Sequence, residues 1–312
     1  MTAATPAANP TAATPTTSTP QVSAVTVAAG KAQKRLTSPW ASLFAVTLAL
    51  LWTLPTFGLF VTSFRPRRAI LTSGWWTAFS HPAFTLDNYR AVLSTQGSSA
   101  LGEYFVNSFI ITIPAVIVPT VLALLAAYAF AWIDFRGRAT LFVMVFALQI
   151  VPIQVTLLPL LTLYVKAGLA GTFWTIWISH SIFALPLAIF LLHNFMKEIP
   201  KELLEAARVD GAGHIAILFR VLLPLLTPAL AAFGIFQFLW VWNDLLVALT
   251  FAGGGTATAP ITVALATLSG TRGTAWYLLS AGAFVAIVVP VAVFLSLQRY
   301  FVRGLLAGGL KG

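Results

Sequence analysis

Six long apolar stretches alternate with polar segments along the chain. They cover residues 40–62, 105–132, 141–165, 173–195, 228–251 and 276–297. Each reaches the roughly 20 residues that a helix, rising about 1.5 Å per residue, needs to cross a hydrocarbon core about 30 Å thick. Together they contain no Lys, Arg or Glu, and a single acid, Asp244. The pattern predicts an all-α integral membrane protein with six transmembrane helices.

Prolines fall inside most of these stretches, at positions 55, 114, 119, 152, 159, 186 and 290. A proline removes one backbone hydrogen bond from a helix and leaves a carbonyl oxygen without its donor. Membrane helices tolerate this where a neighbouring helix satisfies the freed carbonyl. We therefore expect kinks at these positions.

The remaining segments suggest the domain organisation. Residues 1–38 are rich in Ala, Thr, Pro and Ser and predict a disordered tail, because such a composition buries too little apolar surface to offset the entropy of ordering. The transmembrane domain is expected over 39–303 and a glycine-rich tail over 304–312. Residues 64–103 are too polar and too interrupted to span, and we expect an interfacial or external cap with its tryptophans at headgroup depth.

Composition excludes several classes of protein. Of the 312 residues, 59% are hydrophobic and 8% charged, too few charges to cover a soluble globule of this size. The chain has no cysteine, and its four histidines are scattered, so we expect neither a metal site nor a catalytic site. The basic residues behind the net charge of +10 lie between apolar runs instead of interleaving with aromatics, so nucleic acid is not expected as a partner.

The same basic residues predict the orientation. With the N-terminus inside, 12 of the 18 Lys and Arg residues fall on the inner side. Inner loops of membrane proteins carry an excess of these residues, so we expect both termini in the cytoplasm. Arg65, Arg67 and Arg68 fall on the outer side and oppose this assignment.

Four of the eight acidic residues lie in one inner loop, residues 197–224. Pro200 suits the first turn of a helix there, and Gly211 suits the left-handed residue that ends one. Leu203, Leu204 and Ala207 share one side of this helix, while charged residues share the other. A short amphipathic helix is therefore predicted.

A second helix over 214–223 is predicted to lead back to the membrane and to hold the first one rigidly. The paired Ala206 and Ala207 give a low surface that lets another backbone approach closely. Charged loops between spans are often only solvated connectors, but these combined features favour a protein-docking surface.

The run Glu-Ala-Ala-Arg-Val-Asp-Gly-Ala at 205–212, followed by Leu223-Pro224, resembles the EAA loop of ABC importer permeases. The resemblance extends over roughly residues 60–312 and includes Trp242-Asn243-Asp244. These features are similar to the carbohydrate permeases of the maltose type. The run Ser73-Gly74-Trp75-Trp76-Thr77 resembles their alpha-glucoside branch.

This resemblance implies a bacterial or archaeal cell-membrane subunit whose loop acts as a coupling helix on a separate ATPase. The residues expected to carry the coupling are Glu202, Glu205, Ala206, Ala207, Asp210, Gly211, Ala212 and Pro224. The implied partners are a second permease subunit, an ATPase dimer, an extracytoplasmic sugar-binding protein and membrane lipid. The sequence has no G-x-x-x-x-G-K-[ST] phosphate loop, so ATP and Mg²⁺ are expected on the partner ATPase and no cofactor on this chain.

Polar residues within the apolar stretches are candidates for a translocation path. They are Asn107, Gln149, Gln154, Asn243 and Asp244. An ionisable side chain inside a membrane is a functional candidate, but it can also satisfy helix contacts near the headgroups, and amides can serve interhelical packing. Both interpretations stay open for each residue.

The resulting hypothesis is a permease subunit that forms half of the path of an ATP-driven carbohydrate importer, for an oligosaccharide or alpha-glucoside. An ABC importer for a nutrient other than a sugar is the alternative, because a docking loop reports the motor and not the cargo. A proton-coupled transporter would need several intramembrane carboxylates, and one aspartate does not favour it.

Overall fold

The computed structural model describes residues 39–94, 101–253, 257–268 and 276–309, where its regular elements are helices. The long helices are α2 (Pro39–Ser63), α5 (Gly102–Trp132), α8 (Phe173–Lys197), α11 (Leu223–Trp242) and α14 (Leu279–Gly309). The shorter ones are α3 (Arg67–Thr72), α4 (Asp87–Leu93), α6 (Arg138–Ala147), α7 (Ile153–Lys166), α9 (Lys201–Val209), α10 (His214–Ala216), α12 (Leu246–Phe251) and α13 (Ile261–Leu268). Three 3₁₀ turns, η1 (Trp75–Ala78), η2 (Leu148–Ile150) and η4 (Trp276–Leu278), and a π-helical turn, η3 (Ile217–Leu222), complete them.

Among the described residues, five helices are long and apolar enough to cross a membrane, and a sixth span would consist of a bent pair. The prediction of an all-α membrane protein is thereby confirmed. The chain divides into two compact units, residues 1–58 and 59–312. In the first, the described residues belong to α2, which continues through Pro55. The predicted tail over 1–38 lies outside the described residues.

The third apolar stretch does not form the straight span that its composition predicts. It splits into Arg138–Ile150 and Ile153–Lys166, whose axes differ by 99°. The break falls at Val151 and Pro152, both of which have extended backbone angles. Proline disfavours the helical conformation of the residue before it. Val151 adopts the extended conformation, so the helix ends here instead of kinking.

The fifth span also differs from its predicted limits. It begins at His214, runs through α10, η3 and α11, and ends at Trp242. Pro224 lies in the first turn of α11 and Pro228 further along it, so the second helix of the loop and the fifth span are one continuous helix. Asp244 therefore lies in the turn after the span and not within it, which corrects its placement at 228–251.

The other limits shift less. The sixth helix begins at Leu279, after η4 has taken up Trp276. It continues to Gly309, so the first part of the segment expected to be a tail is helical.

Three of the helix prolines are accommodated by side chains of neighbouring helices. Prolines 114, 119 and 290 each lack the N–H that would bond the carbonyl four residues earlier. A side-chain N–H from another helix donates to each of these oxygens: Trp177 Nε1 to Ile110 (3.0 Å), Gln237 Nε2 to Ala115 (3.1 Å) and Trp242 Nε1 to Ala286 (3.0 Å). The helices thus stay continuous at these prolines and are joined to each other there.

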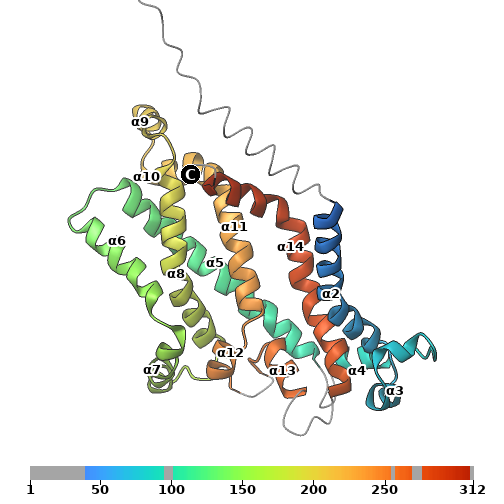
Figure 1. Cartoon of the computed structure of the whole chain (residues 1–312). Coiled ribbons are helices and arrows are strands. Elements are labelled where there is room, and N and C mark those ends of the chain that lie inside the picture. The colour runs from blue at the N-terminus through green and yellow to red at the C-terminus, as the bar shows by residue number, and fades with distance from the viewer. Residues whose placement is uncertain (1–38, 95–100, 254–256, 269–275, 310–312) are drawn as a thin grey trace, which may run out of the picture. The chain divides into compact units, whose positions relative to one another are not determined.

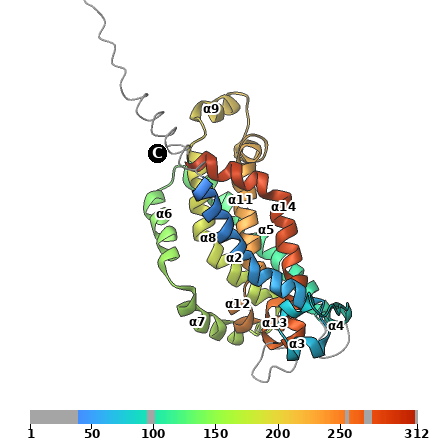
Figure 2. The same cartoon turned by 45° about the vertical axis from the view of Figure 1, so that its right-hand side comes forward.

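Within residues 59–312, α5 packs mainly on α8, and α11 packs on α5, α8 and α14. One buried apolar cluster joins the C-terminal halves of α5 and α8 to α9, η3 and the start of α11. A second joins the N-terminal parts of α5 and α8 to α7 and α12. The helices α9 and α10 lie at one end of this bundle, and α3, α4, α12 and α13 lie at the other (Figures 1 and 2).

The predicted cap contains α3, η1 and α4, which are all too short to span. Its centre is Arg65, only 3% exposed. The guanidinium donates to the carbonyl oxygens of Ala69 and Ser73, at the end of α3, and to the Ser73 and Thr77 hydroxyls. Burial lowers the pKa of Arg65 from its ordinary value, but arginine remains charged at any physiological pH. Hydrogen bonds from Arg65 thus hold α3 and η1 together, and the depth of the tryptophans of the cap in a membrane stays a prediction.

Candidate coupling loop and translocation cavity

The loop between α8 and α11 has a well-defined backbone. Pro200 occupies the N-cap position, directly before the first residue of α9, with φ −57° and ψ 134°, and does not lie in the first turn of the helix. Gly211 has a φ of 82°, the left-handed conformation that glycine adopts without strain. The Ala212 N–H donates to the Ala207 oxygen, and the Gly211 N–H to the Arg208 oxygen. This pair of bonds is the Schellman motif, which closes the C-terminus of a helix.

The helix α9 attaches to the bundle through a narrow apolar side. Leu204 is only 2% exposed and belongs to the same apolar cluster as Met196 and Leu222. Ala207 and Ala212 pack against that cluster. Leu203, which was expected on this side, is 43% exposed, because the buried stripe is narrower than the pattern predicts. The loop is therefore anchored on its own chain and cannot be a loose connector.

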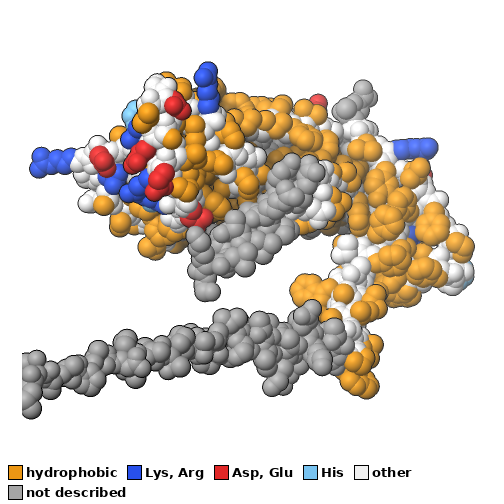
Figure 3. Space-filling model, turned by 90° about the horizontal axis from the view of Figure 1, so that it is seen from above, with side chains coloured by type: hydrophobic (Ala, Val, Ile, Leu, Met, Phe, Trp, Pro, Cys, Tyr) orange, Lys and Arg blue, Asp and Glu red, His pale blue; other side chains and the backbone are white. Residues whose placement is uncertain are grey.

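The rest of the loop faces outward and mixes acidic with apolar groups. Glu202, Glu205, Ala206 and Asp210 are exposed. Three large apolar side chains near them are also exposed: Val209 (87%), Ile215 (76%) and Phe219 (51%). Seen from this end, charged side chains gather in one region and hydrophobic side chains cover much of the remainder (Figure 3). An exposed surface that combines apolar and acidic side chains, on a helix anchored to the bundle, is typical of a site that binds another protein.

Pro224, by contrast, is a helix residue. It lies exposed at the start of α11, beyond the π-helical turn. Beside that turn, a depression of about 620 Å³ is lined by residues 213–216, Phe219 and Arg220.

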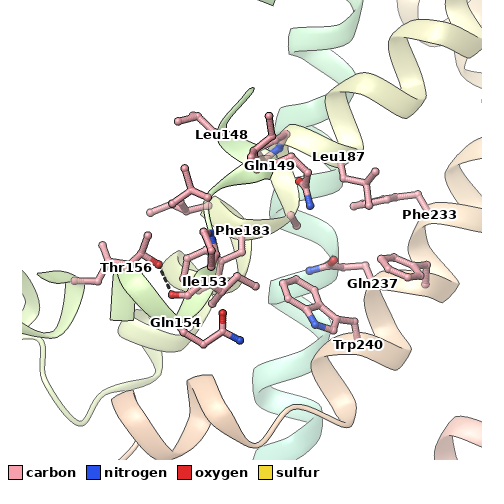
Figure 4. Close-up of a pocket in the computed structure, with 18 residues that line it drawn as sticks. Leu148, Gln149, Ile153, Gln154, Thr156, Phe183, Leu187, Phe233, Gln237 and Trp240 are labelled. Carbon is pink, nitrogen blue, oxygen red and sulfur yellow. Dashed lines mark hydrogen bonds between the residues drawn. The ribbon is translucent and has the colours of Figure 1, made fainter. Parts of the chain in front are cut away.

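A cavity of about 560 Å³ lies where the bend between α6 and α7 faces α8 and α11. Gln149, Gln154 and Thr156 line it from one side and Gln237 and Trp240 from the other (Figure 4). Phe183, Leu187 and Phe233 add apolar surface, and none of the lining residues is charged. A pocket with convergent amides and aromatic rings in an apolar wall is a typical small-molecule site.

The five predicted path residues do not all reach this cavity. Gln149 and Gln154 line it, whereas the other three do not. Asn107 donates to the Ala259 oxygen and holds the segment before α13 against α5. Asn243 donates to the Leu239 oxygen of its own helix.

Asp244 has a different role in the structure. Its carboxylate accepts from the backbone N–H groups of Val247 (3.3 Å) and Ala248 (2.9 Å), and so caps α12. The Nε2 atom of His180 lies 3.7 Å from the same carboxylate. Asp244 therefore contacts the cavity only indirectly, through the His180 ring, which packs edge to face on Trp240 in the cavity wall.

Comparison with known proteins decides the family. Residues 119–306 match the model of the family described as binding-protein-dependent transport system inner membrane component. The chain belongs to this family. The resemblance to ABC importer permeases, which the loop 197–224 indicated, is confirmed.

Two permease proteins are similar in sequence to the chain over most of its length. It is 53% identical over 270 residues to the osmoprotective compounds uptake permease protein GgtD of Synechocystis sp., covering 85% of this chain and 90% of that one. It is 50% identical over 243 residues to the alpha-glucoside transport system permease protein AglG of Rhizobium meliloti, covering 76% and 63%.

A solved structure shares the fold. It is that of a bacterial ABC transporter involved in the import of the acidic polysaccharide alginate, and the superposition has a TM-score of 0.69 at 22% identity. The match covers 86% of this chain and 98% of the other.

The region that matches the permease family contains both α9 and every residue of the cavity, whereas Asn107 precedes it. Sequence reasoning missed Gln237 and Phe183 as cavity residues, and it favoured an anchor at the membrane interface over a sugar-stacking role for Trp240. Gln237 is a polar residue in the middle of an apolar stretch, which is a usable signal. The two aromatic residues, Phe183 and Trp240, give no such signal in the sequence, because aromatic residues also anchor helices in membranes.

Proposed function

We propose that this permease-family chain is one of two permease subunits of an ATP-driven carbohydrate importer, and that α9 couples it to a separate ATPase. The main support for this proposal is that α9 and the wall of the cavity are packed together in one buried cluster. Leu204 of α9 and Phe233 of α11 lie in the same buried cluster, and Phe233 lines the cavity. Close-packed interiors transmit displacement, so movement of α9 would reshape the cavity.

The ATPase partner is inferred from the outer surface of α9. Val209, Ile215 and Phe219 would enter an apolar cleft, and Glu202 and Glu205 would face basic groups at its rim. Closure of the ATPase on ATP would pull α9 and switch the path between inward-facing and outward-facing states. ATP must then bind one of these states more tightly, because a ligand with equal affinity for both shifts nothing.

The cavity favours an uncharged, hydroxyl-rich cargo. Gln149 and Gln154 offer both donors and acceptors, and Trp240 offers an aromatic face for an apolar sugar face. The absence of charged residues among its lining disfavours an ionic cargo. The names of several relatives support this: besides the alpha-glucoside permease, a 35% identical relative from Halalkalibacterium halodurans is an arabinooligosaccharides transport system permease.

A second cargo has specific support. The relative at 53% identity is named for osmoprotective compounds, so an osmoprotectant importer is the competing function. The two functions share the coupling mechanism and differ in what the complex accepts.

The test is a proteoliposome assay of the complete complex with its partner permease, ATPase and binding protein. A panel of alpha-glucosides, other oligosaccharides and osmoprotectants is scored by stimulated ATP hydrolysis and by uptake. Trp240→Ala is expected to raise the half-saturating concentration of the cargo roughly 3- to 10-fold, the size of one aromatic contact. Trp174→Ala, exposed and outside the cavity, is the matched control. Stimulation by no sugar would refute the carbohydrate assignment.

Coupling is tested by cross-linking. Because the chain has no cysteine, Val209→Cys gives a single reactive site on α9. It is expected to cross-link to a cysteine in the cleft of the ATPase, and His81→Cys in the cap is not. Absence of any cross-link from α9 in an active complex would refute the docking role.

A further inference from the structure

A polar contact joins the coupling loop to α5. The Tyr128 hydroxyl and the His214 Nδ1 atom lie 2.7 Å apart, and the two rings meet edge to face with centroids separated by 5.9 Å. An imidazole nitrogen that carries no proton accepts the bond from the tyrosine hydroxyl. Since the two residues are 86 positions apart, the contact ties two separate elements together.

The two partners differ in how deeply they are buried. Tyr128 is 5% exposed, and its ring is packed in the apolar cluster beside Ala127 and Ala131 of α5. His214 is exposed and is the first residue of α10, directly after the turn that follows α9 within the coupling loop. The bond therefore links a buried side chain of α5 to the first residue of α10 in the coupling loop.

This bond differs in kind from the apolar attachment of α9. Burial of Leu204 stabilises the position of α9 on the bundle and transmits its displacement, but the hydrophobic attraction itself has no preferred direction. A hydrogen bond weakens steeply when its angle is lost. Tyr128 is thus placed to fix the position of the loop relative to α5.

The helix α5 leads from this bond to the cavity. Ala115 lies 13 residues before Tyr128, about 20 Å along the helix. Its carbonyl accepts the hydrogen bond from Gln237, which lines the cavity. A displacement of His214 can therefore reach the cavity wall along α5, in addition to the direct connection through α11.

We propose that Tyr128 and His214 are positioning residues that make α5 move with the coupling loop, so that ATP hydrolysis and cargo movement stay linked. This rests on the proposed docking of α9 on an ATPase. Loss of the bond leaves α9 docked and the ATPase active, but lets α5 lag behind the loop.

The experiment measures cargo transported per ATP hydrolysed by the complete complex in proteoliposomes. Tyr128→Phe removes only the hydroxyl, and His214→Leu removes the ring nitrogen at an exposed position that should not affect folding. Each is expected to lower the ratio roughly 2- to 10-fold, the size expected from loss of one neutral hydrogen bond. Basal ATP hydrolysis is expected to stay near that of the wild type.

Two further variants separate positioning from general destabilisation. The amide of asparagine occupies the place of the imidazole Nδ1, so His214→Asn should retain the wild-type ratio while His214→Gln should not. The double variant Tyr128→Phe/His214→Leu should be no worse than either single one, because both remove the same bond. Tyr164→Phe, which removes a buried hydroxyl bonded to Ser179 at 3.0 Å, is the control and should leave the ratio unchanged.

A wild-type ratio in both Tyr128→Phe and His214→Leu would overturn the proposal, as would additive losses in the double variant. The Val209→Cys cross-link to the ATPase is recorded in the same samples. If the cross-link forms and the ratio is unaffected, only the role of Tyr128 and His214 fails. If the cross-link is absent in the wild-type background, the docking of α9 itself fails.

Discussion

At the scale of single residues, substitutions of Asp244 can distinguish a role of its negative charge in transport from a role in capping α12. Its carboxylate bonds two backbone N–H groups at the start of α12. Asparagine offers one acceptor oxygen where the carboxylate uses two, so Asp244→Asn should keep one of the two bonds, lose only part of the thermal stability in detergent that Asp244→Ala loses, and retain uptake. Asp244→Ala should destabilise by about 1 kcal/mol, the usual cost of a lost cap. Loss of uptake in Asp244→Asn at a melting temperature above that of Asp244→Ala would instead show that the negative charge acts in transport.

Gln237 permits a second test at this scale. Pro119 has no N–H to donate to the Ala115 oxygen four residues earlier, and the Gln237 side chain donates to that oxygen instead. Gln237→Leu leaves that buried carbonyl unpaired and should cost about 1–3 kcal/mol. Pro119→Ala returns the missing N–H, so the double variant should recover much of the loss. The measurement is the melting temperature of each variant in detergent.

A second glutamine of the cavity, Gln154, serves as the control for this comparison of single and double variants. Gln154 lines the same cavity but is exposed and lies on the opposite wall, so Gln154→Leu should show no coupling to Pro119→Ala. Strict additivity between Gln237→Leu and Pro119→Ala would contradict the role assigned to this bond.

At the scale of elements, the coupling loop was predictable because its signals are local. Pro200, Gly211 and the alternation of charged and apolar positions determine a helix with two defined ends, whatever surrounds it. The width of the buried side was wrong, since the burial of Leu204 and exposure of Leu203 depend on how α9 approaches η3. Pro200 also lies one residue before the first turn in which it was predicted. The bend in the third span was missed because a proline predicts a kink or a break equally well, and packing decides between them.

The end of α9 gives the third prediction. Gly211 has a φ of 82° and Gly213 one of −76°, and an added Cβ would meet nothing within 4 Å at either position. Gly211→Ala should therefore cost roughly 1–2 kcal/mol through backbone strain alone, whereas Gly213→Ala should be nearly neutral. Trypsin cleavage after the exposed Lys201 and Arg208 reports the loosened helix, and should accelerate only in Gly211→Ala. Equal cleavage rates in the two variants would show that the left-handed turn does not stabilise α9.

At the scale of the whole molecule, the cavity could not be derived from the sequence. Gln149 and Gln154 stand out as amides in an apolar stretch, but their meeting with Trp240 requires the 99° bend and the packing of α8 against α11. Asn107 stands out in the same way and instead holds a loop. Polarity within a span thus identifies residues that must find a partner, and the fold alone determines whether that partner is cargo or backbone.

The orientation of the chain is the last prediction, and the described loops alone support it weakly. The end that carries α9 has basic residues at 136, 138, 197, 201, 208 and 220, against 65, 67, 68, 90 and 166 at the opposite end. The excess predicted for the inner side therefore comes largely from the two termini. A coupling loop can meet an ATP-dependent partner only where ATP is present, so the proposed function also predicts that α9 lies in the cytoplasm.

Cysteine labelling in intact cells tests this orientation directly, because the chain has no native cysteine. Arg136→Cys lies in the exposed segment between α5 and α6, at the end that carries α9, and His81→Cys lies exposed in the cap. A membrane-impermeant maleimide should label His81→Cys in intact cells and Arg136→Cys only after permeabilisation. Arg136 lies outside the coupling loop, so a bound ATPase should not mask it. Labelling of Arg136→Cys in intact cells would place α9 outside, where no ATPase could act on it, and would exclude the coupling mechanism altogether.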